Sequence, residues 1–197
     1  MGDAAQLGER LGDAGNVLFL GPSVTPAVDT ACMAHLPTGA RAHVIAVNFS
    51  PNPGTWLDRY DEHAGESPAG VVLVTTSDTS IDETAYDWPV AVEGLSSPAD
   101  LTGIGMVVSK YLERWQGRET VALCFDSLTA LLQYEDAKDV YRFLHIISTR
   151  LAGTAARSHF HLDPMTQDDQ TVSTLRSSFD AVATFDPDAE TWEVARR

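Results

Sequence analysis

Short apolar runs alternate with helix-like segments along most of the chain. Continuous apolar stretches of five to seven residues are typical of strands that are buried on both faces of a sheet. They predict strands at 16–20, 43–47, 70–75 and 120–126, with a shorter one at 89–92. Further strands are expected at 156–162 and 179–185. Between them, helical periodicity and turn signals predict helices at 26–36, 55–63, 98–115, 136–151 and 166–178. This alternation indicates an α/β fold with a mostly parallel sheet covered by helices on both faces.

The ends of the chain differ from this pattern. A turn at residues 186–188 leads into 191–195, which we expect to pair with the last parallel strand as an antiparallel hairpin. Residues 1–15 are expected to be a mobile N-terminal segment, and no linker divides the rest. The sequence therefore predicts a single domain over 16–197. Within it, Ser97 followed by Pro98 predicts a helix N-cap.

The net charge of the chain limits the kinds of molecule that it is expected to bind. The chain carries 28 Asp and Glu against 13 Lys and Arg, for a net charge of −15. This balance disfavours a nucleic-acid face and a polybasic membrane contact. No apolar run approaches the roughly 18 residues that a membrane span needs, and the acidic first 15 residues are not a secretion signal. We therefore expect a cytoplasmic protein without membrane insertion.

Only two of the basic residues are Lys, at 110 and 138. An acid-rich, Lys-poor composition resembles proteins of salt-loving archaea, in which molar salt screens the charges of a chain like this one. In such cells many proteins are acidic, which weakens the charge argument against nucleic acid. One alternative therefore stays open: a nucleic-acid accessory protein with Arg150, Arg157 and Arg176 on one face.

The turn after the first strand is the first candidate site. The stretch NVLFLGPSVTPAVDTA, residues 16–31, has the strand–turn–helix order of a phosphate-binding loop. A working loop reads G-x-x-x-x-G-K-[ST]. Counted from Gly21, the second glycine is replaced by Pro26, the lysine by Ala27 and the hydroxyl by Val28. Proline has no backbone N–H that could donate a hydrogen bond to a phosphate. Ala27 lacks the positive charge of the loop lysine, and Val28 lacks the hydroxyl that binds magnesium.

A second candidate is the strand VALCFDSLTALL, residues 121–132, which ends in Asp126 and Ser127. An apolar strand ending in Asp resembles the Walker B strand of ATPases, whose Asp orders magnesium. The alternative is that Asp126 only caps the turn that follows.

The order of these segments resembles the RecA/RadA/KaiC class of P-loop ATPases. The resemblance covers about 16–195 and includes DVYRFLHIISTRL (139–151) and SHFHLDPMTQDDQTVSTLRSSFDAVATF (158–185). It implies a RecA-like three-layer αβα sandwich and self-association, or association with an intact relative. The family's catalytic Glu has no counterpart near Asn48, and its loop Lys and Thr are missing. The expectation is a RecA-like domain with a degenerate Walker A motif, no catalytic residue and no cofactor, which acts through protein contacts.

Two alternatives to this hypothesis stay open. One is a nucleotide-responsive switch or slow ATPase, in which ATP and magnesium would be held by Gly21, Ser23, Thr25, Asp126 and Ser127. The other is the nucleic-acid accessory protein already described.

His159, His161 and Asp163 form a further constellation. The two histidines share one face of a strand, and with Cys124 or His145 they could ligate a metal. Histidines that are satisfied within the core explain the pattern as well, and we expect no metal. A Ser127–His161–Asp163 triad lacks the glycines of a nucleophile elbow. Cys32 and Cys124 lie in apolar surroundings and are expected to be buried and reduced.

Overall fold

The structure is a computed structural model that describes residues 2–23, 25–76, 81–117, 120–154 and 156–197. Eight strands form one sheet: β1 (Asn16–Leu20), β2 (Ala42–Asn48), β3 (Gly70–Thr76), β4 (Val90–Leu95), β5 (Thr120–Asp126), β6 (Arg157–Leu162), β7 (Ala181–Asp186) and β8 (Thr191–Arg196). Their order is β4-β3-β2-β5-β6-β1-β7-β8. All neighbours are parallel except β7 and β8, which pair antiparallel. The expected α/β class and the C-terminal hairpin are thereby confirmed.

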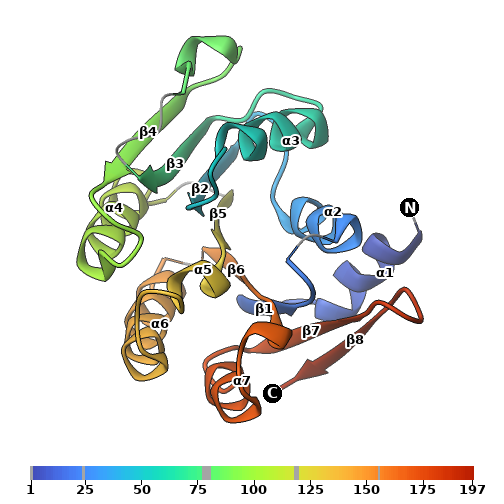
Figure 1. Ribbon diagram of the computed structural model, residues 1–197. Coiled ribbons are helices and arrows are strands. Elements are labelled where there is room, and N and C mark those ends of the chain that lie inside the picture. Colours follow the sequence, from blue (N-terminus) through green and yellow to red (C-terminus); the bar gives the residue numbers. More distant parts are fainter. Residues whose placement is uncertain (1, 24, 77–80, 118–119, 155) are drawn as a thin grey trace.

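The helices lie in two layers, one on each side of the sheet (Figure 1). One layer contains α1 (Gly2–Leu11), α2 (Pro26–His35) and α3 (Gly54–Ala64). The other contains α4 (Leu101–Arg114), α6 (Ala137–Ala152) and α7 (Asp169–Arg176), with the short helix α5 (Leu128–Leu131) following β5. Two 3₁₀ turns complete the described elements, η1 (Glu83–Ala85) and η2 (Pro164–Thr166). This arrangement is the expected three-layer sandwich.

Alternating side chains of the strands build the core on each face of the sheet. On β1, Val17 and Phe19 pack toward α1 and α2, whereas Leu18 and Leu20 pack toward the α4, α6 and α7 layer. Both faces are buried because the central strands carry apolar residues at successive positions. The apolar stripe of α4 packs into the core on this side of the sheet: Ile104, Val108, Tyr111, Leu112 and Trp115 are buried, and Leu101 is partly buried.

The N-terminal segment, which was expected to lie outside the domain, includes helix α1. Leu7 and Leu11 of this helix are buried in the cluster that contains Val17 and Phe19. The helix contacts α2 and β8, and Arg10 Nη1 donates a hydrogen bond to the carbonyl of Trp192 at 2.6 Å. The apolar core therefore extends to residues before position 16.

The sequence-based N-cap of α4 was wrong. The cap is Asp100, whose Oδ1 accepts a hydrogen bond from the backbone N–H of Gly103 at 2.7 Å. Ser97 instead accepts from the N–H of Ala99 at 3.1 Å, in the turn before the helix. Both residues are good caps, and the sequence offered two of them three positions apart.

Candidate functional site

The carboxyl ends of the central parallel strands meet at one edge of the sheet. Leu20 of β1 pairs with Leu162 of β6, and Asn48 of β2 pairs with Asp126 of β5. The turn from β1 to α2 therefore lies at the same edge as the end of β5. In open α/β sheets this edge is where ligands bind, so the structure places the five predicted site residues at the edge where a ligand would be expected.

Gly21 makes a close bend at the start of the turn. Its N–H donates to the carbonyl of Leu162 at 3.2 Å, which fixes the loop to the end of β6. A Cβ added to Gly21 would lie 2.6 Å from Cγ2 of Val28 and 3.3 Å from Cβ of Phe185. Val28 is buried, so its side chain fills the space next to the bend.

Ser23 donates its backbone N–H to Oδ2 of Asp163 at 3.0 Å. Asp163 follows β6, and its other carboxylate oxygen accepts from the N–H of Met165 at 3.0 Å. The backbone N–H of Asp163 donates to Oγ1 of Thr129 at 2.8 Å. The Asp163 carboxylate thus accepts the hydrogen bond that the Ser23 amide would otherwise donate to an anionic ligand.

Thr25 is the N-cap of α2, and its side chain makes no capping hydrogen bond. Its backbone N–H donates to the carbonyl of Pro22 at 3.3 Å, and its carbonyl accepts from the N–H groups of Val28 and Asp29. The loop is therefore closed by hydrogen bonds within its own backbone.

Asp126 lies at the end of β5, and its side chain accepts a hydrogen bond from a residue of β2. Nδ2 of Asn48 donates to its Oδ2 at 2.9 Å, while Oδ1 of Asn48 accepts from the N–H of Ser50 at 2.9 Å. The cap of the following helix is Ser127, whose Oγ accepts from the N–H of Ala130 at 3.3 Å. Ser127, and not Asp126, therefore caps the helix that follows β5. The alternative that Asp126 only caps this turn was wrong.

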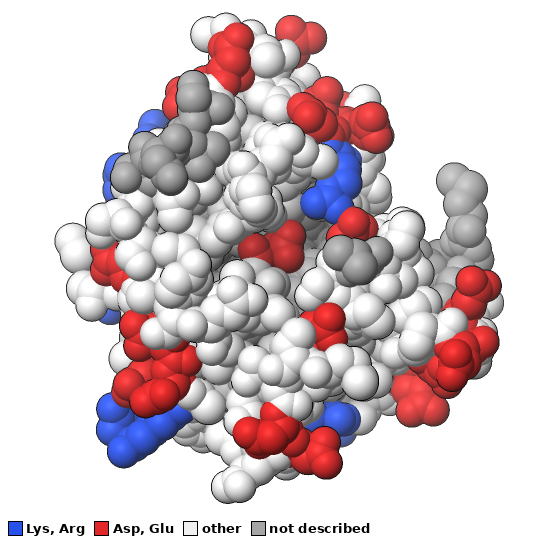
Figure 2. Space-filling view, in the orientation of Figure 1, with Lys and Arg blue, Asp and Glu red and all other residues white. Residues whose placement is uncertain are grey.

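Acidic groups dominate the electrostatics of this edge. Asp29 of α2 forms an ion pair with Arg59 of α3. Burial raises the pKa of Asp29, the Arg59 guanidinium lowers it, and the Asp126 carboxylate raises it further. Figure 2 shows acidic side chains inside the hollow at the middle of this face. A triphosphate approaching this edge would meet carboxylates rather than a free ammonium group.

Beneath the loop, Cys32 of α2 lies against His159 and His161 of β6. Sγ of Cys32 is 3.7 Å from Nδ1 of His161, which is itself 3.6 Å from Oδ1 of Asp126. The ring of Phe19 makes edge-to-face contacts with both histidines. Burial lowers the pKa of His159 and of His161, although the Asp126 carboxylate acts against this at His161, and burial raises the pKa of the Cys32 thiol.

These contacts change the grouping that the sequence suggested around His159 and His161. The structure brings Cys32 to them, whereas the sequence offered Cys124 or His145. His145 is exposed on α6, in the layer on the other side of the sheet. Cys124 pairs with His159 across the β5–β6 ladder, as its expected place beside the histidines requires, but its sulfur is not among the clustered ligand atoms of Cys32, His159 and His161. Both cysteines are free and buried, as expected.

The hypothetical triad does not form. The Oγ of Ser127 accepts from the N–H of Ala130, the carboxylate of Asp163 accepts from two backbone amides, and His161 faces Asp126 instead. The aromatic residues near the irregular segments belong largely to the core. Trp56, Tyr60 and Trp88 are buried.

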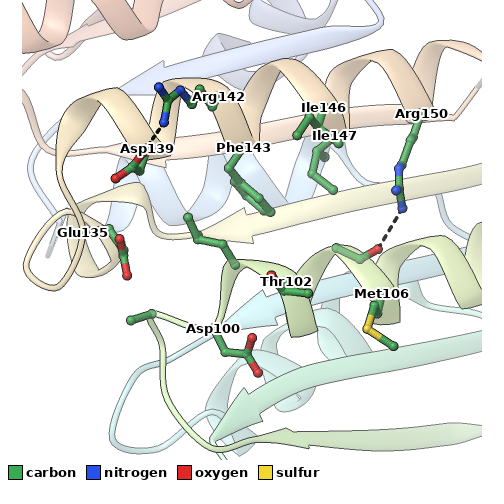
Figure 3. A pocket seen from close by; sticks show the side chains of 13 residues that line it. Asp100, Thr102, Met106, Glu135, Asp139, Arg142, Phe143, Ile146, Ile147 and Arg150 are labelled. Carbon is green, nitrogen blue, oxygen red and sulfur yellow. Dashed lines mark hydrogen bonds and ion pairs between the residues drawn. The ribbon is translucent and has the colours of Figure 1, made fainter.

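A second concave surface lies between α4 and α6 (Figure 3). This α4–α6 groove has a volume of about 550 Å³. Its apolar side chains include Met106, which is 68% exposed, and Ile146, which is 53% exposed. Arg142 pairs with Asp139 at one part of the groove, and Arg150 bonds to the carbonyl of Gly105 at another. The sequence could have indicated this groove, because Met106 and Ile146 are large apolar residues that fall outside the buried stripes of their helices.

No helix in the described part of the chain is long and apolar enough to cross a membrane.

Comparison with known proteins gives a family and a fold. A model of the family described as a "family of unknown function (DUF7504)" matches residues 14–185. No curated protein has a sequence similar to this chain.

Three solved structures are similar at low sequence identity. A protein from Pyrococcus horikoshii OT3 matches with a TM-score of 0.56 and 8% identity over 94% of this chain and 89% of that one. An ATPase of the type III secretion system of pathogenic bacteria matches with a TM-score of 0.51 and 13% identity. The match covers 89% of this chain and 52% of the ATPase, so the chain spans about half of that protein. The flagellar accessory protein FlaH from Methanocaldococcus jannaschii matches with a TM-score of 0.48 and 9% identity over 91% of this chain and 76% of FlaH. At such identities the first two likenesses support the RecA-like fold alone.

Proposed function

We propose that this chain, which belongs to the DUF7504 family, is a non-catalytic RecA-like domain that acts through protein–protein contacts as a regulatory or scaffolding protein. The observation that carries the proposal is the hydrogen bond from the Ser23 amide to the Asp163 carboxylate. The position where a phosphate would be bound already holds an anion of the chain.

The rest of the loop supports the same reading. The backbone N–H groups of Gly21 and Thr25 also donate to backbone carbonyls. Pro22 and Pro26 have no backbone N–H that could donate to a phosphate. Binding a phosphate here would require breaking these bonds and bringing a second anion next to Asp163. Without a lysine in the loop, nothing in the loop offsets that cost.

The α4–α6 groove is the surface that best fits a protein partner. Large apolar side chains at 68% and 53% exposure are the type of residue that interfaces bury. Charged side chains such as Arg142 and Asp139 border them, as in the polar rim of a protein interface. We assign this groove to the apolar face of a helix from a second protein or a second copy of the chain.

Site-specific photo-crosslinking in the native cell tests this assignment. A photo-reactive amino acid replaces Ile146 in the groove or, as a matched control, Asp188 in the exposed turn between β7 and β8. The proposal expects a discrete crosslinked species from position 146 and none from position 188. Equal crosslinking at the two positions, or none at 146, would contradict it.

Loss of nucleotide binding is tested separately by calorimetric titration of the chain with ATP and ADP, with magnesium, in molar potassium chloride. The proposal expects no saturable binding in the micromolar range. Micromolar affinity would refute it, whatever the crosslinking result.

A nucleotide-responsive switch is the second candidate. The Asp126 side chain is 27% exposed and lies at the same edge as Ser23, where a magnesium ion could reach it. That the chain resembles an ATPase in fold adds to this candidate. It requires ATP turnover that disappears in Asp126→Ala, and phosphate release at the background rate would exclude it.

A nucleic-acid-binding role has less support, because Arg150 and Arg157 do not lie on one face of the molecule. Arg150 lies at the α4–α6 groove, whereas Arg157 lines a pocket beside α1 and α2, on the other side of the sheet. For the cellular setting, we propose the cytoplasm of a salt-loving archaeon, on the strength of the net charge of −15 and the near absence of Lys.

A further inference from the structure

We propose that Cys32, His159 and His161 form a buried binding site for a thiophilic divalent cation, best matched by Zn²⁺. Each of the three residues offers one ligand atom, and these atoms all lie within 4.8 Å of one another. The site joins α2 to β6 underneath the loop. It is independent of the proposed function, because it involves neither nucleotide nor partner.

The first argument is the state of the two imidazoles. Nε2 of His159 and Nε2 of His161 are buried and have no hydrogen-bond partner among the residues that the structure describes. His159 is 1% exposed and His161 is 9% exposed. A buried polar nitrogen without a partner is destabilising, so two adjacent ones call for a ligand that satisfies them.

The second argument is the chemistry of the donor set. Thiolate sulfur and neutral imidazole nitrogen are the ligands that zinc prefers in proteins. With Zn–N near ~2.0 Å and Zn–S near ~2.3 Å, tetrahedral ligands lie roughly 3.3–3.8 Å apart. The three ligand atoms lie within 4.8 Å of one another, so a contraction of about 1 Å brings the widest pair to this spacing.

The third argument is charge. A dication in an apolar core needs negative partners. Cys32 supplies one as a thiolate, since metal binding displaces the thiol proton. Asp126 supplies the other, with Oδ1 at 3.6 Å from His161 Nδ1. A carboxylate beside a ligating histidine is the usual arrangement that orients the ring and strengthens the ligand.

Three protein ligands leave the fourth tetrahedral position to a water molecule. Phe19 packs its ring edge-to-face with both histidines, which keeps water from the cluster on that side. The partial exposure of Asp126 leaves one side of His161 near solvent, from which the ion can enter. Bound metal would hold α2 against β6.

Cobalt substitution tests the site on the full chain, because Co²⁺ reports its own ligands. The protein is freed of metal with a chelator and titrated with Co²⁺ and then with Zn²⁺. The proposal expects one ion per chain, the intense visible bands of tetrahedral cobalt, a thiolate-to-cobalt charge-transfer band, and loss of all these on adding Zn²⁺. A wild-type protein that binds Co²⁺ without the charge-transfer band would overturn the proposal.

Two cysteine variants provide the matched comparison. Cys32→Ser should lose the charge-transfer band and bind Zn²⁺ more than about 100-fold more weakly, beyond the 10- to 100-fold typical of an outer-shell change. Cys124→Ser changes an equally buried cysteine that lies beside His159 on β5 but is not one of the three ligands, and it should retain both properties. Equal affinity in the two variants, or loss in Cys124→Ser alone, would contradict the proposal. If Cys32→Ser does not fold, His161→Gln replaces it, with the same expected loss of affinity.

Discussion

Asp163 joins three separate segments of the chain through single hydrogen bonds. Its carboxylate accepts from Ser23 in the loop and from Met165 in η2, and its amide donates to Thr129 in the short helix after β5. Two of these contacts reach residues 140 and 34 positions away. An interaction with phosphate at Ser23 would have to compete with a carboxylate that is held in place by its own backbone.

The bend at Gly21 gives a prediction about stability. Gly21→Ala should lower the free energy of unfolding by about 1–3 kcal/mol, because the added methyl would overlap Val28 in a packed core. Gly8→Ala is the control, since a Cβ at Gly8 meets nothing within 4 Å and alanine favours the helix; it should stabilise by about 0.5–1 kcal/mol. Denaturant unfolding measures both, and unchanged stability in Gly21→Ala would show that Val28 does not close the bend.

His35 gives a prediction about pH. Burial, and secondly the Arg157 charge, lower the pKa of His35 from 6.5 to about 4. Because the folded-state pKa lies below the unfolded value, the unfolded chain binds more protons between pH 6.5 and 4. Stability is therefore lost as the pH falls through this range, by about 3 kcal/mol from this residue.

The measurement is the free energy of unfolding from pH 7 to 4 with a chelator present, for the wild type and for His35→Phe, which keeps an aromatic ring beside Phe19. The variant should lose about 3 kcal/mol less than the wild type over this range. Parallel curves for the two proteins would mean that His35 is protonated equally in both states.

Residues that act through distant partners were the hardest to predict. The period of two on β6 placed His159 and His161 on one face, as the structure has them. Nothing in the sequence indicated that Cys32 would face them, because the contact joins Cys32 to His161 across a separation of 129 residues. The pairing of Ser23 with Asp163 was hidden for the same reason.

At the scale of elements, the central strands β1, β2, β3 and β5 were predicted well because each carries an uninterrupted apolar run, which β6 lacks. Helix α5 has only four residues and shows no periodicity, so no pattern marks it. Helix α1 contributes Leu7 and Leu11 to the core, but its remaining positions are mostly polar or small, and such a short amphipathic pattern is hard to separate from a mobile terminus.

The start of α4 gives a direct test of which cap operates. Asp100→Ala should cost about 0.5–2 kcal/mol, because it removes the acceptor for the Gly103 amide. Ser97→Ala should cost less, since Ser97 accepts from Ala99 in the turn before the helix. Thermal or denaturant unfolding ranks the two variants, and a larger loss in Ser97→Ala would restore the sequence-based assignment.

At the scale of the whole molecule, the surface is strongly acidic. Figure 2 shows acidic side chains scattered over the visible face, with fewer basic ones. A net charge of −15 opposes compaction through self-repulsion. Ion pairs such as Lys110–Glu93 and Arg142–Asp139 offset only part of it.

Salt should therefore stabilise the fold. Raising potassium chloride from about 0.1 M to about 1 M shortens the Debye length from about 10 Å to about 3 Å, which weakens repulsion among the carboxylates. The free energy of unfolding, measured with urea because it adds no ionic strength, should increase over this range. A constant or falling stability would contradict the proposed adaptation to high salt.

The Ser23 amide reports most directly whether the loop binds a triphosphate. Its resonance in a ¹⁵N–¹H correlation spectrum, followed in molar potassium chloride as magnesium–ATP is raised to millimolar concentration, is predicted to stay where it is. A shift of that resonance that saturates at micromolar ATP would show that phosphate displaces Asp163, and would contradict the loss of nucleotide binding.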